Sequence, residues 1–109
     1  MLNWQDFEKV DMRVGTVINA QIFAEAKKPA YKLEIDFGTE LGIKKSSAQI
    51  TELYLVEDLI GKQIVAVVNF KPKQIGPFMS ECLVLGIYNK NGVVLIEPNI
   101  KVENGEKIG

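Results

Sequence analysis

The sequence predicts an all-β protein: a small closed barrel of five to seven short strands, with one short helix near its start. Several short segments alternate apolar and polar residues, as strands with one buried face do. Glycine, proline or Asn-Gly interrupts the chain at short intervals, and no long helical pattern separates the strands as it does in βαβ units. With 109 residues and no internal repeat or linker, residues 1–109 are expected to form one domain around one core.

The helix is expected directly after Asn3. The side chain of Asn3 can cap it, because its oxygen can accept a hydrogen bond from a free amide of the first turn. Trp4, Phe7 and Val10 follow at steps of three and place an apolar stripe on one side. A helix this short is marginal alone. The stripe must therefore pack either on its own domain or against a second copy in a dimer.

The first strand is expected over "MRVGTVINAQI", residues 12–22. Its period of two places four side chains on one face: Met12, Val14, Thr16 and Ile18. Gly15 interrupts the run, and a glycine inside a long strand often marks a bend or bulge.

The clearest strand is "YKLEIDFG", residues 31–38. Its apolar side chains point to one face, and these are Leu33, Ile35 and Phe37. Its charged side chains point to the other, and these are Lys32, Glu34 and Asp36. This strand is expected to lie half-buried, with its charged side toward solvent.

The remaining segments predict two further strands, a hairpin, the turns between them and a tail. Gly38 and Gly42 bracket a turn, after which residues 43–50 form a more polar strand. Residues 51–61 form a short helix or turn that ends at Gly61. Residues 62–70 are apolar on both faces, which indicates a central strand. Residues 82–98 form a hairpin around Asn91-Gly92, and a turn and a short tail follow.

The composition argues against an enzyme. The chain has no histidine, the commonest general base and metal ligand, and its single cysteine lies in an apolar run typical of a core. Asp6, Glu8 and Asp11 cluster near the start, with a spacing typical of solvated surface charge. We therefore expect no catalytic residue, no bound metal and no cofactor.

The same features indicate a cytoplasmic protein. No run approaches the ~18 apolar residues of a membrane-spanning helix, and the first residues lack the basic and apolar regions of a secretory signal. A lone cysteine fits a reducing compartment. No stable membrane insertion is expected.

The lysines are unevenly distributed along a chain whose net charge is −1. Seven of them fall in three clusters: Lys27, Lys28 and Lys32; Lys44 and Lys45; and Lys71 and Lys73. Adjacent strands would join these clusters into one positive face suited to phosphate. The alternative is that they are solvated strand edges that discourage aggregation.

The segment "NFKPKQIGPFMS", residues 69–80, is expected to be a stiff loop with two lysines, two prolines and no carboxylate. Phe78 and Met79 beside lysines suit a single-stranded or looped nucleic acid. They equally suit an apolar peptide groove with a charged rim. Phe37 and Phe70 would complete that groove, although their alternation along strands also fits core positions.

Several stretches occur in the order and spacing of a known family: "DMRVGTV", "AYKLEIDFG", "SSAQI", "LIGKQIVAVVNFKPKQI", "SECLVLG" and "NGEKIG". Together they resemble the free-standing tRNA-binding domain that is also appended to methionyl- and phenylalanyl-tRNA synthetases. The stretch "IDFGTELGIKKSSAQIT" is similar to the CsaA-type members of that family, which are export-related chaperones. The resemblance covers essentially the whole chain.

This resemblance implies an OB-fold, a five-stranded barrel with a short N-terminal helix and small additional elements. It implies a homodimer built through the segment that contains Trp4, Phe7 and Val10. It also implies binding to structural features of tRNA near its elbow. For CsaA-type members it implies binding of unfolded or exported polypeptides, with the Sec export motor as a candidate partner. The family's members are not catalysts.

The family's motifs, together with the lysine clusters, give the candidate nucleic-acid contacts: Lys32, Lys44, Lys45, Ser47, Asn69, Lys71, Lys73 and Ser80. Its "S-x-G-M-x-L" signature falls on Ser80 to Leu85, with Cys82 and Leu83 in place of glycine and methionine. The candidate peptide contacts are Phe37, Phe70, Phe78 and Met79.

Overall fold

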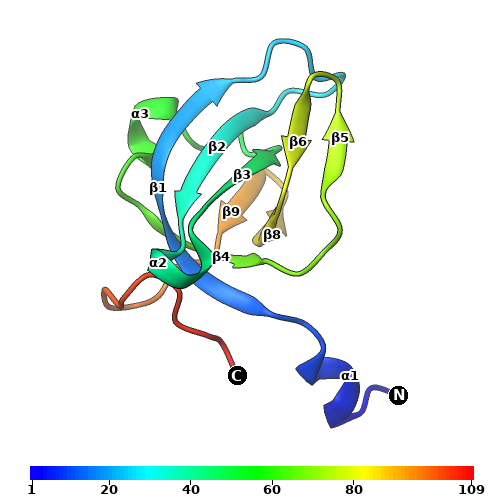
Figure 1. The fold of residues 1–109 in the computed structure, drawn as a ribbon. Coiled ribbons are helices and arrows are strands. Elements are labelled where there is room, and N and C mark those ends of the chain that lie inside the picture. Colours follow the sequence, from blue (N-terminus) through cyan, green and yellow to red (C-terminus); the bar gives the residue numbers. More distant parts are fainter.

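The computed structural model, which describes residues 1–109, confirms the all-β OB-type barrel (Figure 1). Its main sheet has five antiparallel strands in the order β3-β2-β1-β4-β7. Their bounds are Met12–Ile22 for β1, Tyr31–Asp36 for β2, Ile43–Ala48 for β3, Gln63–Val67 for β4 and Leu83–Val84 for β7. The sheet curls until its two terminal strands, β3 and β7, approach each other, which nearly closes the barrel.

Side chains of the segment before β7 complete this closure. Glu81 donates its backbone N–H to the Lys45 carbonyl (2.7 Å), and the Lys45 N–H donates to Glu81 Oε1 (2.8 Å). The Ser47 N–H donates to Ser80 Oγ (3.0 Å), and Ser46 Oγ donates to the Cys82 carbonyl (2.9 Å). Part of the open edge of β3 is thus covered by backbone and side-chain groups of residues 80–82 instead of a regular strand ladder.

The long strand β1 is irregular, but not at the residue that the sequence indicated. Its register with β2 shifts between Val17 and Asn19, so the side-chain alternation changes there. Ile18 has no partner on β2 and is 43% exposed, and beyond it Asn19 lies opposite Glu34 while Ala20 lies opposite Leu33 in the core. Gly15 serves close packing instead, because a Cβ there would lie 2.6 Å from the Cγ2 atom of Ile35.

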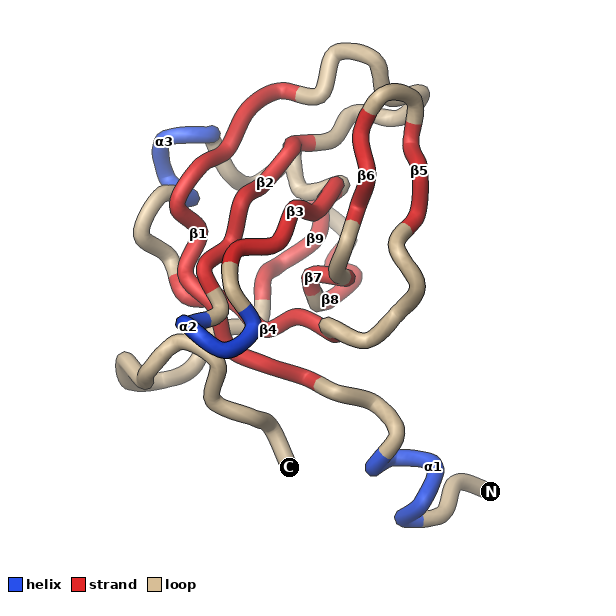
Figure 2. Tube along the Cα trace, in the orientation of Figure 1, coloured by secondary structure: helices blue, strands red, loops and turns tan.

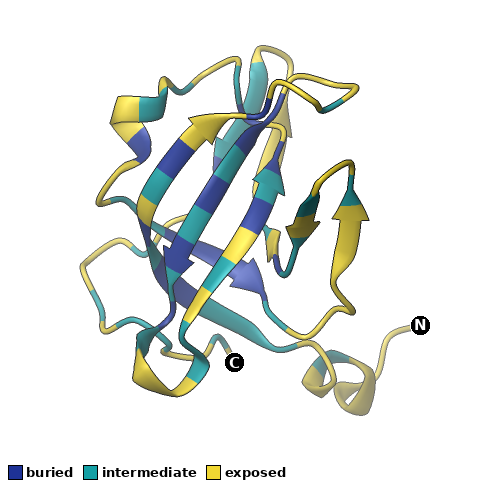
Figure 3. Ribbon diagram, turned by 45° about the horizontal axis from the view of Figure 1, so that its top comes forward, coloured by how far each residue is buried: buried dark blue, intermediate teal, exposed yellow.

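Strands β2 and β4 agree with the sequence. Residues along β2 alternate between buried and half-buried, with Leu33 and Ile35 inside (Figure 3). Strand β4 lies between β1 and β7 and buries all four residues from Ile64 to Val67. This confirms its central position.

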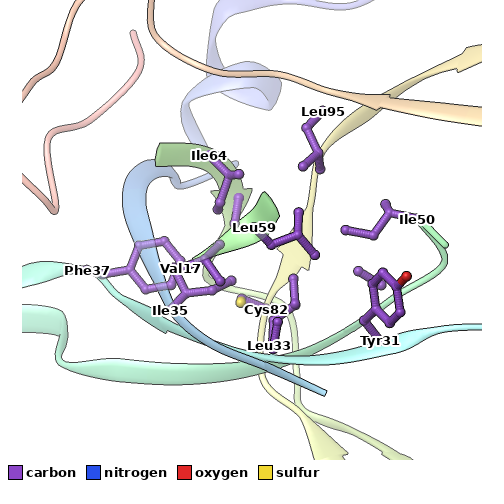
Figure 4. Packing of buried hydrophobic residues seen from close by; sticks show 13 residues of the cluster. Val17, Tyr31, Leu33, Ile35, Phe37, Ile50, Leu59, Ile64, Cys82 and Leu95 are labelled. Atoms are coloured by element: carbon purple, nitrogen blue, oxygen red, sulfur yellow. The ribbon is translucent and has the colours of Figure 1, made fainter. Parts of the chain in front are cut away.

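The core fills the inside of the barrel (Figure 4). Its most completely buried side chains are Val17, Leu33, Ile35, Phe37, Leu59 and Ile64. Leu59 comes from α3, Val56–Leu59, the short helix or turn that the sequence predicts before Gly61. Cys82 packs in the same cluster, which confirms that it is a core residue.

Small elements surround the barrel (Figure 2). They are α1 (Trp4–Glu8), α2 (Gly38–Leu41), and the hairpins β5–β6 (Lys73–Ile75 and Phe78–Ser80) and β8–β9 (Gly86–Asn89 and Gly92–Leu95). Asn3 caps α1 as predicted, since its Oδ1 accepts from the Asp6 N–H at 2.9 Å. The predicted hairpin is also present, but its two turn residues are Lys90 and Asn91 instead of Asn91 and Gly92, since Asn89 pairs with Gly92, whose φ is +140°.

The β5–β6 hairpin replaces the loop expected over residues 69–80. Gly76 takes a φ of +55°, and Ile75 pairs with Phe78, so Gly76 and Pro77 form a two-residue turn. Proline thus occupies the turn, where it removes no ladder hydrogen bond. The candidate ligand contacts in this segment therefore lie on a paired ribbon.

None of the helices combines the length and the apolar composition that crossing a membrane requires.

Candidate functional site

The outer side of β1, β2 and β3 brings polar side chains into two cross-strand rows. The register places Lys32 opposite both Gln21 and Ser47, and Glu34 opposite both Asn19 and Lys45. Directly opposed side chains in a sheet lie close enough to act on one ligand. We call this surface the sheet face and define it by six residues: Asn19, Gln21, Lys32, Glu34, Lys45 and Phe78.

Two aromatic rings hold the lysines of the sheet face in place. The rings of Phe23 and Phe78 meet edge to face with their centroids 5.4 Å apart. Lys32 Nζ lies 5.6 Å from the Phe23 centroid, and Lys45 Nζ lies 5.5 Å from that of Phe78. An ammonium group over an aromatic ring is attracted by the electrons of its face. The two lysines are thus oriented by contacts that leave their charges free for an anion.

A small hollow of about 110 Å³ lies among these side chains. The carboxylate of Glu34 lowers the positive potential of this hollow. One oxygen of that carboxylate, Oε2, accepts a hydrogen bond from Asn19 Nδ2 at 2.7 Å. Two ammonium groups, two amides and an aromatic edge are the groups that bind phosphates and bases of an RNA loop. The face is therefore chemically suited to a structured nucleic acid.

Phe23 was not among the candidates that the sequence indicated. It is 3% exposed and follows directly after β1, with its N–H donated to the Ala30 carbonyl at 3.0 Å. A buried aromatic beside lysine-bearing strands looks like any core residue in the sequence. Phe23 supports the sheet face only because the β5–β6 hairpin places the ring of Phe78 against it.

Three candidate nucleic-acid contacts have other roles or positions. Successive side chains of a strand alternate, so Lys44 and Lys45 leave β3 on opposite faces, and only Lys45 joins the sheet face. Asn69 is occupied, since its Oδ1 accepts from the Asp11 N–H (3.0 Å) and its Nδ2 donates to the Lys9 carbonyl (2.6 Å). Ser80 accepts from the Ser47 N–H and so closes the barrel.

A second, more apolar hollow of about 230 Å³ lies beside the start of the β5–β6 hairpin. We call it the Phe70 hollow, and it is lined by Phe70, Lys71, Lys73 and the segment Ser80–Leu83. Phe70 is 59% exposed and Leu83 is 48% exposed, whereas Lys71 and Lys73 add charge to the lining. It matches an apolar groove with a charged rim.

The four candidate peptide contacts do not form one groove. Phe37 is 1% exposed and packs in the core, where its ring faces Gly15, so it cannot reach a ligand. Phe78 belongs to the sheet face. Met79 alternates with Phe78 along β6 and therefore points to the other side of the hairpin. Phe70 alone lines the second hollow.

The one thiol is chemically inert. Burial raises the pKa of Cys82 to about 11, while hydrogen bonding with Ser46 and the charge of Lys44 lower it less. At neutral pH the group is therefore a neutral thiol, which is a poor nucleophile. The structure also contains no group of three or more Asp, Glu or Cys side chains placed to hold a metal ion.

The apolar stripe of α1 lies away from the barrel. Figure 1 shows the helix beyond the start of β1, and it buries none of its own residues. Trp4 is 79% exposed, Phe7 is half-buried and Val10 is 36% exposed. Leu2, Asn3, Trp4, Phe7 and the terminal Gly109 line a wide hollow of about 550 Å³. The structure therefore does not show the stripe packing on its own barrel.

The comparison with known sequences agrees with this geometry. The family model described as "Putative tRNA binding domain" matches residues 12–107. The methionine–tRNA ligase of Protochlamydia amoebophila is 36% identical over 96 residues, which cover 88% of this chain and 13% of the ligase. The chain spans between 13% and 15% of the length of such curated relatives.

Two solved structures are similar over essentially the whole chain. The chaperone CsaA of Bacillus anthracis is 57% identical with a TM-score of 0.93, covering 100% of this chain and 99% of that one. The CsaA chaperone protein of Picrophilus torridus is 52% identical with a TM-score of 0.96, covering 100% of both chains.

Proposed function

Because the chain belongs to the tRNA-binding domain family and is a homologue of the CsaA chaperones, we propose that it binds unfolded polypeptides without catalysing a reaction. One observation carries this proposal: the similarity to the two chaperones extends over 100% of this chain at 52% and 57% identity. The ligases, in contrast, are matched over a small fraction of their length. Binding alone also fits a chain without histidine.

The Phe70 hollow is the part of the surface best suited to hold a polypeptide. Phe70 and Leu83 present large exposed apolar groups, and burying such surface drives association. Lys71 and Lys73 can pair with carboxylates of a bound segment. The base of the hollow is fixed, since Ser80 and Glu81 are hydrogen-bonded to β3. A preformed surface lowers the ordering cost of binding.

An aggregation assay tests this proposal. A denatured client protein is diluted with and without the chain, and light scattering follows its aggregation. The wild-type chain should slow aggregation, whereas Phe70→Ser should slow it less. Ile22→Ser is the matched control, since Ile22 is 71% exposed and lines neither hollow. If the wild-type chain neither slows aggregation nor binds a peptide array, the proposal is wrong.

For the physiological role, we propose that the clients are polypeptides destined for export and that the protein acts in the cytoplasm. In this role the Sec export motor is a partner that receives the client. The support is the similarity to CsaA-type members. Co-precipitation of the chain with the motor in the presence of an export precursor should exceed that with a mature protein, and equal recovery of both would argue against it.

A second candidate function, binding of tRNA, is favoured by the sheet face. Lys32 and Lys45 are oriented there by Phe23 and Phe78, beside the amides of Asn19 and Gln21. This surface shares no residue with the Phe70 hollow. We therefore propose that tRNA and polypeptide occupy different surfaces of one barrel.

We also propose that the chain forms a homodimer through Trp4, Phe7 and Val10. An exposed tryptophan on a helix that buries nothing of its own is the kind of anchor found at the centre of interfaces. A dimer would supply the packing that a five-residue helix needs.

A further inference from the structure

A fourth hollow lies where the barrel is not closed. Its volume is about 280 Å³, and its lining comes from residues 47–50 at the end of β3 and from β7, β8 and β9. We call it the barrel-gap hollow. Its residues are Ser47, Ala48, Gln49, Ile50, Leu83, Val84, Gly86, Tyr88 and Val93. None of them is charged, in contrast to the sheet face and the Phe70 hollow.

The position of this hollow is set by the way the barrel closes. The five-stranded sheet ends at β3 on one side and at β7 on the other (Figure 2). Hydrogen bonds join β3 to the segment 80–82 at Lys45, Ser46 and Ser47, and none joins β3 to β7 or β8 beyond that point. The hollow therefore lies between two terminal strands of one sheet.

The rim of the hollow is unusually apolar for a protein surface. Leu83 is 48% exposed and Tyr88 is 95% exposed, and Ile50, Val84 and Val93 add further apolar groups to the lining. All four residues of β8 are exposed, and this strand pairs only with β9. Exposed apolar groups clustered beside open strand edges mark a place where another chain binds.

We propose that the barrel-gap hollow binds an extended, uncharged apolar segment of a polypeptide client, which adds to the open sheet edge as a further strand. In this mode the client backbone provides hydrogen bonds, and alternate side chains enter the hollow. The inference rests on the proposed chaperone function and adds to it the binding mode and the kind of segment bound.

Charge and continuity favour this occupant. An RNA needs cations for its phosphates, and this hollow offers none. Leu83 lines both this hollow and the Phe70 hollow, so the two form neighbouring parts of one surface. A client whose charged residues meet Lys71 and Lys73 can thus continue as an apolar strand past Leu83 toward Tyr88.

Peptide binding to two variants of the full chain tests the proposal. The probe is a fluorescent, uncharged apolar peptide of about eight residues, roughly the length of a typical strand. Leu83→Glu combined with Tyr88→Glu should weaken its binding at least about tenfold, because a charge would be buried against it. Ile60→Glu is the control, since Ile60 is 49% exposed and lines none of the four hollows.

A second probe tests the strand itself. The same peptide with a methyl group on every backbone nitrogen has no N–H left to donate to a sheet edge, so it should bind at least about tenfold more weakly to the wild-type chain. Equal binding of both peptides would overturn strand addition. Wild-type affinity in the Leu83→Glu, Tyr88→Glu variant would overturn the location, while the chaperone proposal would stand.

Two further outcomes separate other occupants. If the double variant changes the molar mass of the protein in solution, the hollow is a contact between copies of the chain and the proposal is wrong. If the variant loses tRNA binding instead of peptide binding, the hollow belongs to the nucleic-acid site and the proposal is also wrong. Failure of the wild-type chain to bind any peptide would overturn the chaperone function itself.

Discussion

Several polar side chains that a sequence motif offers as ligand contacts hold the barrel together instead. Asn69 fixes the backbone that leads from α1 into β1, and both ends of its amide are used. Ser80 and Glu81 cover the open edge of β3. Glu81, a carboxylate beside a candidate phosphate site, thus has a structural reason to be there. At this scale the side chains free for a ligand are mainly the lysines.

A substitution at Phe37 tests whether this residue belongs to the core or contacts a bound peptide. Phe37→Ala should lower the free energy of unfolding by about 3–5 kcal/mol, because it leaves a cavity among Gly15, Ile35 and the rest of the core. Urea denaturation measures this loss. Under conditions in which the variant is folded, its affinity for an unfolded client should equal that of the wild-type chain, and a weakened affinity would return Phe37 to the peptide site.

Cys82 gives a prediction about pH. Its pKa of about 11 in the folded chain lies above the ordinary value of 9.0. The unfolded chain therefore releases the thiol proton first, and the stabilisation present below about pH 9 is lost as the pH rises toward 11. The loss should approach about 1.4 kcal/mol per pH unit in that range.

The control for this pH effect is Cys82→Ala. The free energy of unfolding, measured by urea denaturation at several pH values above about 8, should fall more steeply for the wild-type chain than for the variant. Parallel curves would mean that the thiol is solvated in the folded state.

At the scale of the element, α1 and the β5–β6 hairpin decide which surfaces are available. Apolar spacing predicts the α1 stripe correctly, but spacing cannot tell whether such a stripe faces its own domain or a partner. The hairpin was missed because its prolines favour a loop in the sequence. In the structure Pro77 lies in the turn and Pro72 precedes the ribbon, so neither interrupts the pairing.

The dimer proposal belongs to α1. Trp4→Glu should convert the protein to a monomer at micromolar concentration, because a charge would replace a desolvated aromatic anchor. Size-exclusion chromatography with light scattering measures the molar mass. Ile22→Glu is the control, since Ile22 is 71% exposed but lies at the opposite end of β1. A wild-type chain that is already monomeric would contradict the proposal.

At the scale of the whole molecule, the fold followed from the sequence and the division of its surfaces did not. Alternation located β2, a run that is apolar on both faces located β4, and family motifs identified the OB-type barrel and the CsaA relationship. The register shift in β1 placed Asn19 beside Glu34, and strand alternation separated Lys44 from Lys45. These outcomes depend on how distant strands pair, as does the meeting of Phe23 and Phe78. A single sequence does not contain that information directly.

Polypeptide and tRNA are proposed to bind different surfaces of the barrel, one apolar and one basic. The most direct test measures the affinity of a labelled unfolded client and of labelled total tRNA at about 50 and about 200 mM salt, since phosphate contacts weaken steeply over this range.

The double substitution Lys32→Glu, Lys45→Glu serves as the variant. If the two surfaces are separate, the affinity for the client should change little with salt or in the lysine variant. The affinity for tRNA should fall steeply with salt, and the variant should lower its salt slope by about two. Client binding that weakens as steeply as tRNA binding, or that is lost in the lysine variant, would mean that the two ligands share one surface.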